Sequence, residues 1–214
     1  MNNEPTSLYR AFQRKEHAIL FLEGNFRLSL LIYYKEIEDK ERRDKSEGQS
    51  SSYIKRNLLS VTLDKRTMEV TSTNHTPGLL HLTGAHIDPM YLMCTCGPDA
   101  ELNYIRKKFG EYVVKINAPK KLLEDINISR PLNSKMEFIR KCVLERVRYT
   151  KDQIQNLDPD SIDAVKLSYL QKPPCFSRDF EYRYIVTAKP CINEEPETFI
   201  WYNLNQKLDY LEII

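Results

Sequence analysis

The sequence lacks the short motifs that mark the commonest nucleotide-binding and hydrolytic enzymes. It has no phosphate-binding loop, no glycine-rich dinucleotide motif after a strand, no nucleophile elbow and no paired-histidine zinc motif. Its four histidines do not occur in the context of a catalytic triad. A function therefore has to be sought in other residue types, chiefly tyrosine, arginine and glutamate.

A strong charge imbalance and a long apolar run are also absent. With 32 Lys and Arg against 30 Asp and Glu, the formal net charge is +2. This balance excludes a global electrostatic attraction to nucleic acid but leaves room for a local basic groove. No apolar run is long enough to span a bilayer, and residues 1–5 do not begin a signal peptide. We expect a cytoplasmic protein without a membrane partner.

The five cysteines are odd in number and lack the spacing of a disulfide framework. Cys94 and Cys96 fall on one face of a predicted strand, but their spacing is not that of a zinc knuckle or a redox pair. We expect thiols that pack as small apolar side chains, and no metal site.

The predicted elements indicate a single domain over residues 1–214, because no linker rich in Pro, Gly or Ser separates two halves. Helices are expected at 15–23, 31–38, 99–109, 119–126 and 160–170, with Asp99 capping the third. Strands are expected at 7–12, 25–30, 53–63, 67–72, 79–82, 90–96, 112–116, 180–187, 198–202 and 208–213, and in the second half of 136–149. Segregated elements predict an α+β fold with a mostly antiparallel, twisted sheet and flanking helices.

Residues 39–52 are nearly devoid of apolar side chains and predict a solvated loop. A loop of this length in a compact domain is often a lid or a binding loop. We expect it either to border a cleft or to be a plain connection.

The most informative segment is 178–187, whose second half alternates like a buried strand. Phe180, Tyr182 and Tyr184 fall on one face, and Glu181, Arg183 and Ile185 fall on the other. A charged group inside a sheet is costly unless it is paired. Two interpretations follow: a structural ion pair, or a catalytic glutamate presented to a cleft and free of a neutralising lysine.

Five short motifs resemble those of a large, poorly characterised bacterial family. They are Leu8–Phe12, the acidic segment 44–48 with its Glu-Gly end, Val147–Tyr149, Lys172-Pro173, and Phe180–Arg183. The layout is also similar to that of the DarT-type ADP-ribosyltransferases, whose last strands carry the catalytic glutamate. The chain has no His-x-Thr motif after Tyr9.

This resemblance implies an ADP-ribosyltransferase-like domain that transfers ADP-ribose from NAD, without a metal. Glu181 is then the catalytic carboxylate, because a fixed negative charge stabilises the oxocarbenium-like state of the ribose. Arg10 or Arg27 would hold the pyrophosphate. The implied ring-stacking residues are Tyr9, Tyr33 and Tyr34, and the implied acceptor-binding residues are Arg42, Arg43, Glu47 and Arg183. Alternatively, Arg27 pairs with Glu38 or Glu47 and the tyrosines are core residues.

The resemblance further implies a toxin or phage-defence effector that modifies nucleic acid and has an antitoxin or immunity partner. The alternative is a non-enzymatic module whose cleft binds a nucleotide or a partner protein. A nuclease ranks last, because the sequence shows no clustered Asp/Glu/Lys core. We expect Arg10, Arg27, Tyr9 and Tyr33 to approach the same cleft as Glu181, since one cofactor needs them together.

Overall fold

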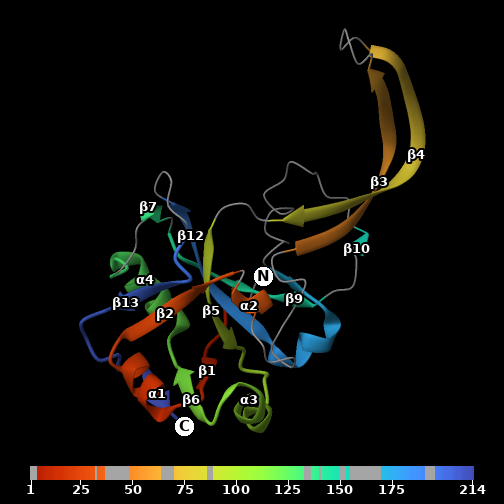
Figure 1. Ribbon diagram of the computed structural model, residues 1–214. Coiled ribbons are helices and arrows are strands. Elements are labelled where there is room, and N and C mark those ends of the chain that lie inside the picture. The colour runs from red at the N-terminus through yellow and green to blue at the C-terminus, as the bar shows by residue number, and fades with distance from the viewer. Residues whose placement is uncertain are drawn as a thin grey trace.

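The computed structural model describes the chain in ten ranges: residues 4–31, 33–36, 49–63, 70–85, 89–132, 136–139, 141–149, 153–154, 170–190 and 196–214. Within these ranges the protein has an α+β fold with a mostly antiparallel sheet and a few helices (Figure 1). None of the helices in these ranges is long and apolar enough to cross a membrane.

The body of the molecule is built around a nine-stranded sheet. Its strands are β1 (Leu8–Phe12), β2 (Asn25–Leu30), β5 (Met90–Cys96), β6 (Tyr112–Ile116), β7 (Met136–Ile139), β8 (Val143–Arg146), β12 (Glu181–Pro190), β13 (Phe199–Asn203) and β14 (Leu211–Ile213). The main path runs β13-β2-β5-β1-β6-β14, and β12 pairs with β5, β7 and β8. Every pair in this sheet is antiparallel.

Four α-helices and one 3-10 helix accompany the sheet: α1 (Lys15–Leu22), α2 (Tyr33–Glu36), α3 (Leu102–Phe109), α4 (Pro119–Ile128) and η1 (Pro174–Asp179). Helix α3 ends before Gly110, which has a φ of 141° and lies against the Phe12 carbonyl group. The predicted cap of α3 is wrong, because Glu101 and not Asp99 precedes its first turn. Residues 160–169 of the last predicted helix lie outside the described residues.

A long antiparallel hairpin of β3 (Gln49–Leu63) and β4 (Val70–Ala85) projects from the body (Figure 1). The loop predicted for 39–52 is therefore wrong over 49–52, which belong to β3, and its other residues lie outside the described ranges. Residues 79–82, predicted as a separate strand, continue β4. Two short parallel pairs join β10 (Gln153–Ile154) to β3, and β9 (Arg148–Tyr149) to β11 (Gln171–Lys172).

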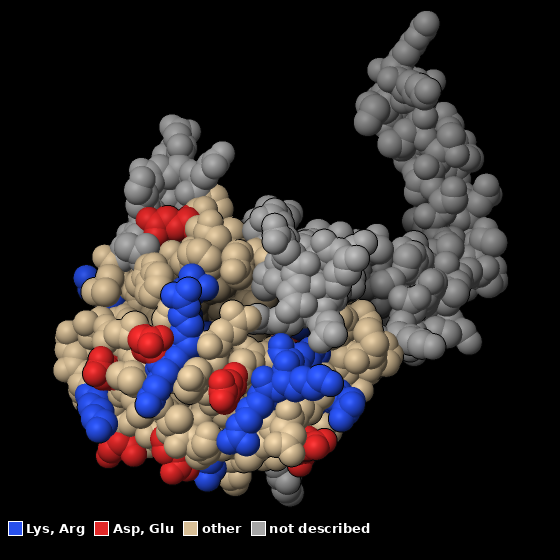
Figure 2. Space-filling model, turned by 60° about the horizontal axis from the view of Figure 1, so that its bottom comes forward, with Lys and Arg blue, Asp and Glu red and all other residues tan. Residues whose placement is uncertain are grey.

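The alternation predicted for β12 is confirmed for residues 182–185, whereas Phe180 lies before the strand and packs against a separate small cluster with Cys96 and Ile105. Tyr182, Tyr184 and Val186 enter the main apolar core, whereas Ile185 joins a smaller core with Leu92. Arg183 is opposite Cys94 and Glu181 is opposite Cys96, so these charged side chains share the face of Leu92. Lys and Arg lie among Asp and Glu over the lower face of the body (Figure 2).

Candidate functional site

A pocket of about 130 Å³ lies where β1, β5 and the start of β12 meet. Its lining combines charged, tyrosyl and thiol side chains: Tyr9, Arg10, Ala11, Tyr34, Cys94, Thr95, Cys96, Lys108, Phe109, Lys172, Asp179 and Glu181. Burial raises the pKa of the Cys96 thiol, and the negative charges of Asp179 and Glu181 raise it further. This thiol therefore stays protonated and is no nucleophile.

Glu181 lies in this pocket wall but is paired on both carboxylate oxygens. Lys172 Nζ donates to Oε2 and Arg183 Nε donates to Oε1, each at 2.7 Å. Glu181 is 5 % exposed and Arg183 is fully buried. The expectation that Glu181 is free of a neutralising lysine is wrong, because the short pair β9–β11 places Lys172 beside it.

The pKa of Glu181 is set by burial and by its two cationic neighbours, which act in opposite directions. Burial by itself would raise the pKa of this carboxyl group, but Arg183 and Lys172 outweigh burial and lower it to about 2. The Glu181 backbone N–H donates to the Tyr149 hydroxyl oxygen at 2.7 Å. Burial and the nearby carboxylate raise the pKa of Tyr149. Glu181 is thus a permanently ionised carboxylate at neutral pH.

A second buried acid–lysine pair lies beside the first. Lys108 Nζ and the Tyr104 hydroxyl both donate to Asp179 Oδ1 at 2.7 Å, and Lys108 Nζ also donates to the Tyr104 oxygen at 3.0 Å. Burial alone lowers the pKa of Lys108, but the bonds to Asp179 and Tyr104 raise it overall. The sequence shows no clustered Asp/Glu/Lys motif, and these two acid–lysine pairs come together only in the folded chain.

Phe180 connects the two acids in an unusual backbone conformation. Its φ and ψ are 45° and 44°, a left-handed conformation that costs a bulky residue roughly 1–2 kcal/mol. The conformation is held from β5, because the Gly97 N–H donates to the Phe180 carbonyl oxygen at 2.7 Å. A Cβ on Gly97 would lie 2.8 Å from that oxygen and 2.9 Å from Tyr182 Cε2.

Gly97→Ala is therefore expected to lower the free energy of unfolding by about 1–3 kcal/mol, the usual cost of overpacking. The reason is that the added methyl group must push β5 away from Phe180. Urea unfolding followed by circular dichroism measures the loss. An unchanged midpoint would contradict the close approach of these two backbones.

Three of the sequence-predicted cofactor residues line the pocket with Glu181: Tyr9, Arg10 and Tyr34. The Arg10 guanidinium donates to the Cys94 carbonyl oxygen at 3.1 Å, and the Tyr34 hydroxyl donates to that of Leu92 at 3.3 Å. Burial raises the pKa of Tyr34, so its hydroxyl stays protonated.

The other predicted residues are placed elsewhere or lie outside the described ranges. Arg27 stacks 4.0 Å from the ring centroid of Phe199, and Tyr33 packs edge-on against the same ring. Neither lines the pocket, so the expectation that they share it with Glu181 is wrong. Arg183 is buried in its ion pair, and this position does not support an acceptor contact. Arg42, Arg43 and Glu47 lie outside the described residues.

Tyr104, Lys108 and Asp179 were not predicted as site residues from the sequence. The spacing of Tyr104 and Lys108, four positions apart on α3, was the available signal because such residues share a helix face. Lys172 was recognised only as part of a motif. No group of three His, Cys, Asp or Glu side chains that could hold a metal occurs in the described part of the chain.

Comparison of this chain with known protein families, with curated proteins and with solved structures gave no match.

Proposed function

We propose that the pocket binds the phosphate-bearing part of a nucleotide. The observation that carries this proposal is its charge. Arg10, Lys108 and Lys172 line the pocket with Asp179 and Glu181, and Arg183 lies directly behind Glu181. Among the described residues, four cations face two carboxylates, an excess of two positive charges around a partly buried site, and this excess favours the binding of an anion.

The size of the pocket limits what it holds. Typical ligand pockets measure roughly 300–1,000 Å³, whereas this one measures about 130 Å³. A phosphate or a ribose phosphate fits such a volume, and a complete dinucleotide does not. The base of the ligand is therefore expected to lie outside the pocket. Tyr9 and Tyr34 in its wall supply the aromatic contacts.

ADP-ribosyl transfer from NAD is the second candidate, and the ionised state of Glu181 favours it. In that reaction the bond from ribose C1′ to nicotinamide breaks, and nicotinamide leaves with the electron pair. An acceptor nucleophile then bonds to C1′ and gives up its proton. A fixed carboxylate stabilises the positive charge that develops on the ribose. Lys172 and Arg183 weaken this effect, so the ligand phosphate has to draw Lys172 away from Glu181.

Replacement of Arg10 tests the binding site. Arg10→Gln is expected to weaken the binding of ADP-ribose about ten-fold or more in isothermal calorimetry, because a charged hydrogen-bond donor is lost. Arg106→Gln removes an exposed guanidinium that contacts only the Ile214 carbonyl oxygen among the described residues, and it serves as the matched control. Equal affinity of both variants, or no affinity of the native protein for ADP-ribose, AMP or NAD, would refute the proposal.

The same preparation separates the two candidates. Release of nicotinamide from NAD, followed by chromatography, reports transfer, whereas tight binding without release identifies a non-enzymatic module. NAD turnover that is unchanged in Glu181→Gln, once that variant is shown to be folded, would remove the transferase assignment.

A further inference from the structure

A second surface lies at the β13 edge of the sheet, on the strand pair β2–β13. Three pairs of directly opposite residues share one face of this ribbon: Ser29 with Phe199, Arg27 with Trp201, and Asn25 with Asn203. The alternate residues, such as Phe26 and Tyr202, stack in the main core on the other face. We call the six residues of the first face the β2–β13 platform.

The contacts on this platform are those of ring stacking. The Arg27 guanidinium lies 4.0 Å from the ring centroid of Phe199 and 5.7 Å from that of Trp201. Trp201 is 44 % exposed although it is a large apolar side chain on a strand. It is also the sole tryptophan of the chain. Two rings and one planar cation thus lie together on one face of an antiparallel ribbon.

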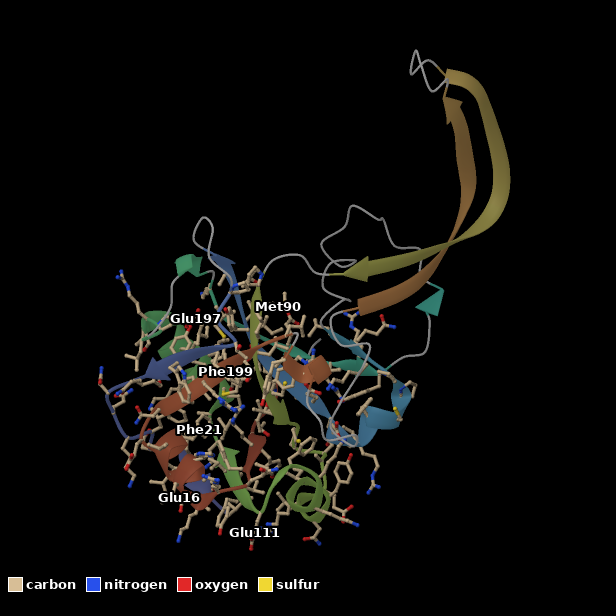
Figure 3. All side chains as sticks on the ribbon, in the orientation of Figure 1. Glu16, Phe21, Met90, Glu111, Glu197 and Phe199 are labelled. Atoms are coloured by element: carbon tan, nitrogen blue, oxygen red, sulfur yellow. The ribbon has the colours of Figure 1, made fainter. Side chains whose placement is uncertain are left out.

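The charge of the platform selects its ligand. Its side chains include one guanidinium and two amides and no carboxylate, and Arg27 makes no salt bridge among the described residues. The backbone N–H of Leu132 donates to the Trp201 carbonyl oxygen at 2.7 Å. Arg130, a second cation, is two residues before Leu132 in the chain. The nearest carboxylate along β13 is Glu197, before the strand begins (Figure 3). Glu16 and Glu111 lie at the lower end of the molecule, away from Phe199 (Figure 3).

We propose that the β2–β13 platform binds single-stranded nucleic acid. Aromatic rings on a sheet accept stacked bases, arginine adds cation–π and phosphate contacts, and asparagine amides pair with the edges of bases. The exposed Leu132, whose backbone is hydrogen-bonded to that of Trp201, is a feature of a protein interface. The amides and the Arg27 guanidinium, which makes no salt bridge within the described ranges, favour a nucleic acid, because such groups would be costly to bury against an apolar partner.

The platform lies on the same face of the sheet as several residues of the pocket. Ser29 is opposite Leu92 on β5, so the platform shares its sheet face with Cys94, Cys96 and Glu181. A strand lying on the platform is therefore on the side of the molecule that also carries the pocket. The proposed nucleic-acid site stands on its own contacts and does not depend on what the pocket binds.

The single tryptophan makes the proposal directly testable. Titration of the full chain with a single-stranded oligothymidylate or oligouridylate is expected to quench Trp201 fluorescence to saturation, because the base stacks on the indole ring. In fluorescence anisotropy, Trp201→Ala is expected to weaken binding roughly ten-fold or more. Trp201→Tyr keeps a stacking ring and is expected to restore most of the affinity.

A control variant at a cation outside the platform tests whether loss of oligonucleotide binding is specific to the platform. Lys121→Gln removes an exposed cation of α4 that pairs with Asp209 at 3.1 Å and is no part of the platform, and it should leave affinity unchanged. Absence of quenching, equal affinity for duplex DNA, or equal affinity of Trp201→Ala would overturn the proposal. A dimer that forms through Trp201 and disappears in Trp201→Ala would identify a protein interface instead.

Discussion

Replacement of Glu181 by glutamine is expected to lower the free energy of unfolding by roughly 3–5 kcal/mol, the usual cost of removing one member of a buried ion pair. The reason is that Arg183 and Lys172 both lose their counter-charge, and Arg183 is fully buried. For a chain of this length, such a loss lowers the melting temperature by on the order of 10 °C. Differential scanning calorimetry measures the change.

Two further variants make this expectation specific. Glu212→Gln removes a half-exposed carboxylate from its pair with Lys115 at 3.4 Å and should change stability by less than about 0.5 kcal/mol. Lys172→Met combined with Glu181→Gln removes one buried cation together with the carboxylate that it neutralises, and should be less destabilised than the two single losses added together. A native-like melting temperature for Glu181→Gln would mean that the carboxylate serves function and not stability.

Low pH is expected to remove the stability that the ionised Glu181 carboxylate contributes to the folded protein. The pKa of Glu181 is about 2 in the folded protein against an ordinary value of 4.5, so the unfolded chain takes up the proton at higher pH. The stability that this carboxylate contributes is therefore complete above its unfolded pKa of 4.5 and is lost as the pH falls toward 2. The stability difference between the native protein and Glu181→Gln should shrink over that window.

Urea unfolding at a series of pH values between about 3 and about 7 measures this difference for both proteins. Glu212→Gln provides the control, because its exposed carboxylate leaves the acid dependence close to that of the native protein. Parallel curves for the native protein and Glu181→Gln would show that another carboxylate causes the acid sensitivity. Asp179, which is buried against Lys108, would then be the next residue to replace.

Local patterns were sufficient to predict most of the strands. The alternation of Tyr182 and Tyr184 with Arg183 predicted the two faces of β12, but Phe180 lies before the strand in a left-handed conformation and packs against another cluster. Apolar periodicity predicted β5 and β6 with their observed bounds. Such predictions succeed because side chains alternate across a strand wherever it lies. They predicted residues 53–63 of β3 but failed for its first four residues, 49–52, which are polar. There the pairing with β4 and not the side-chain composition determines the structure.

The sequence by itself determined that Glu181 and Arg183 point the same way, because residues two apart on a strand share a face. It did not determine their partners. Lys172 reaches Glu181 through the pairing of β11 with β9, and Lys108 reaches Asp179 from α3, 71 positions away. Only the tertiary structure decided that Arg10 joins this pocket while Arg27 stacks on Phe199. The physical reason is that strand order brings together residues far apart in the chain, and no local periodicity records that order.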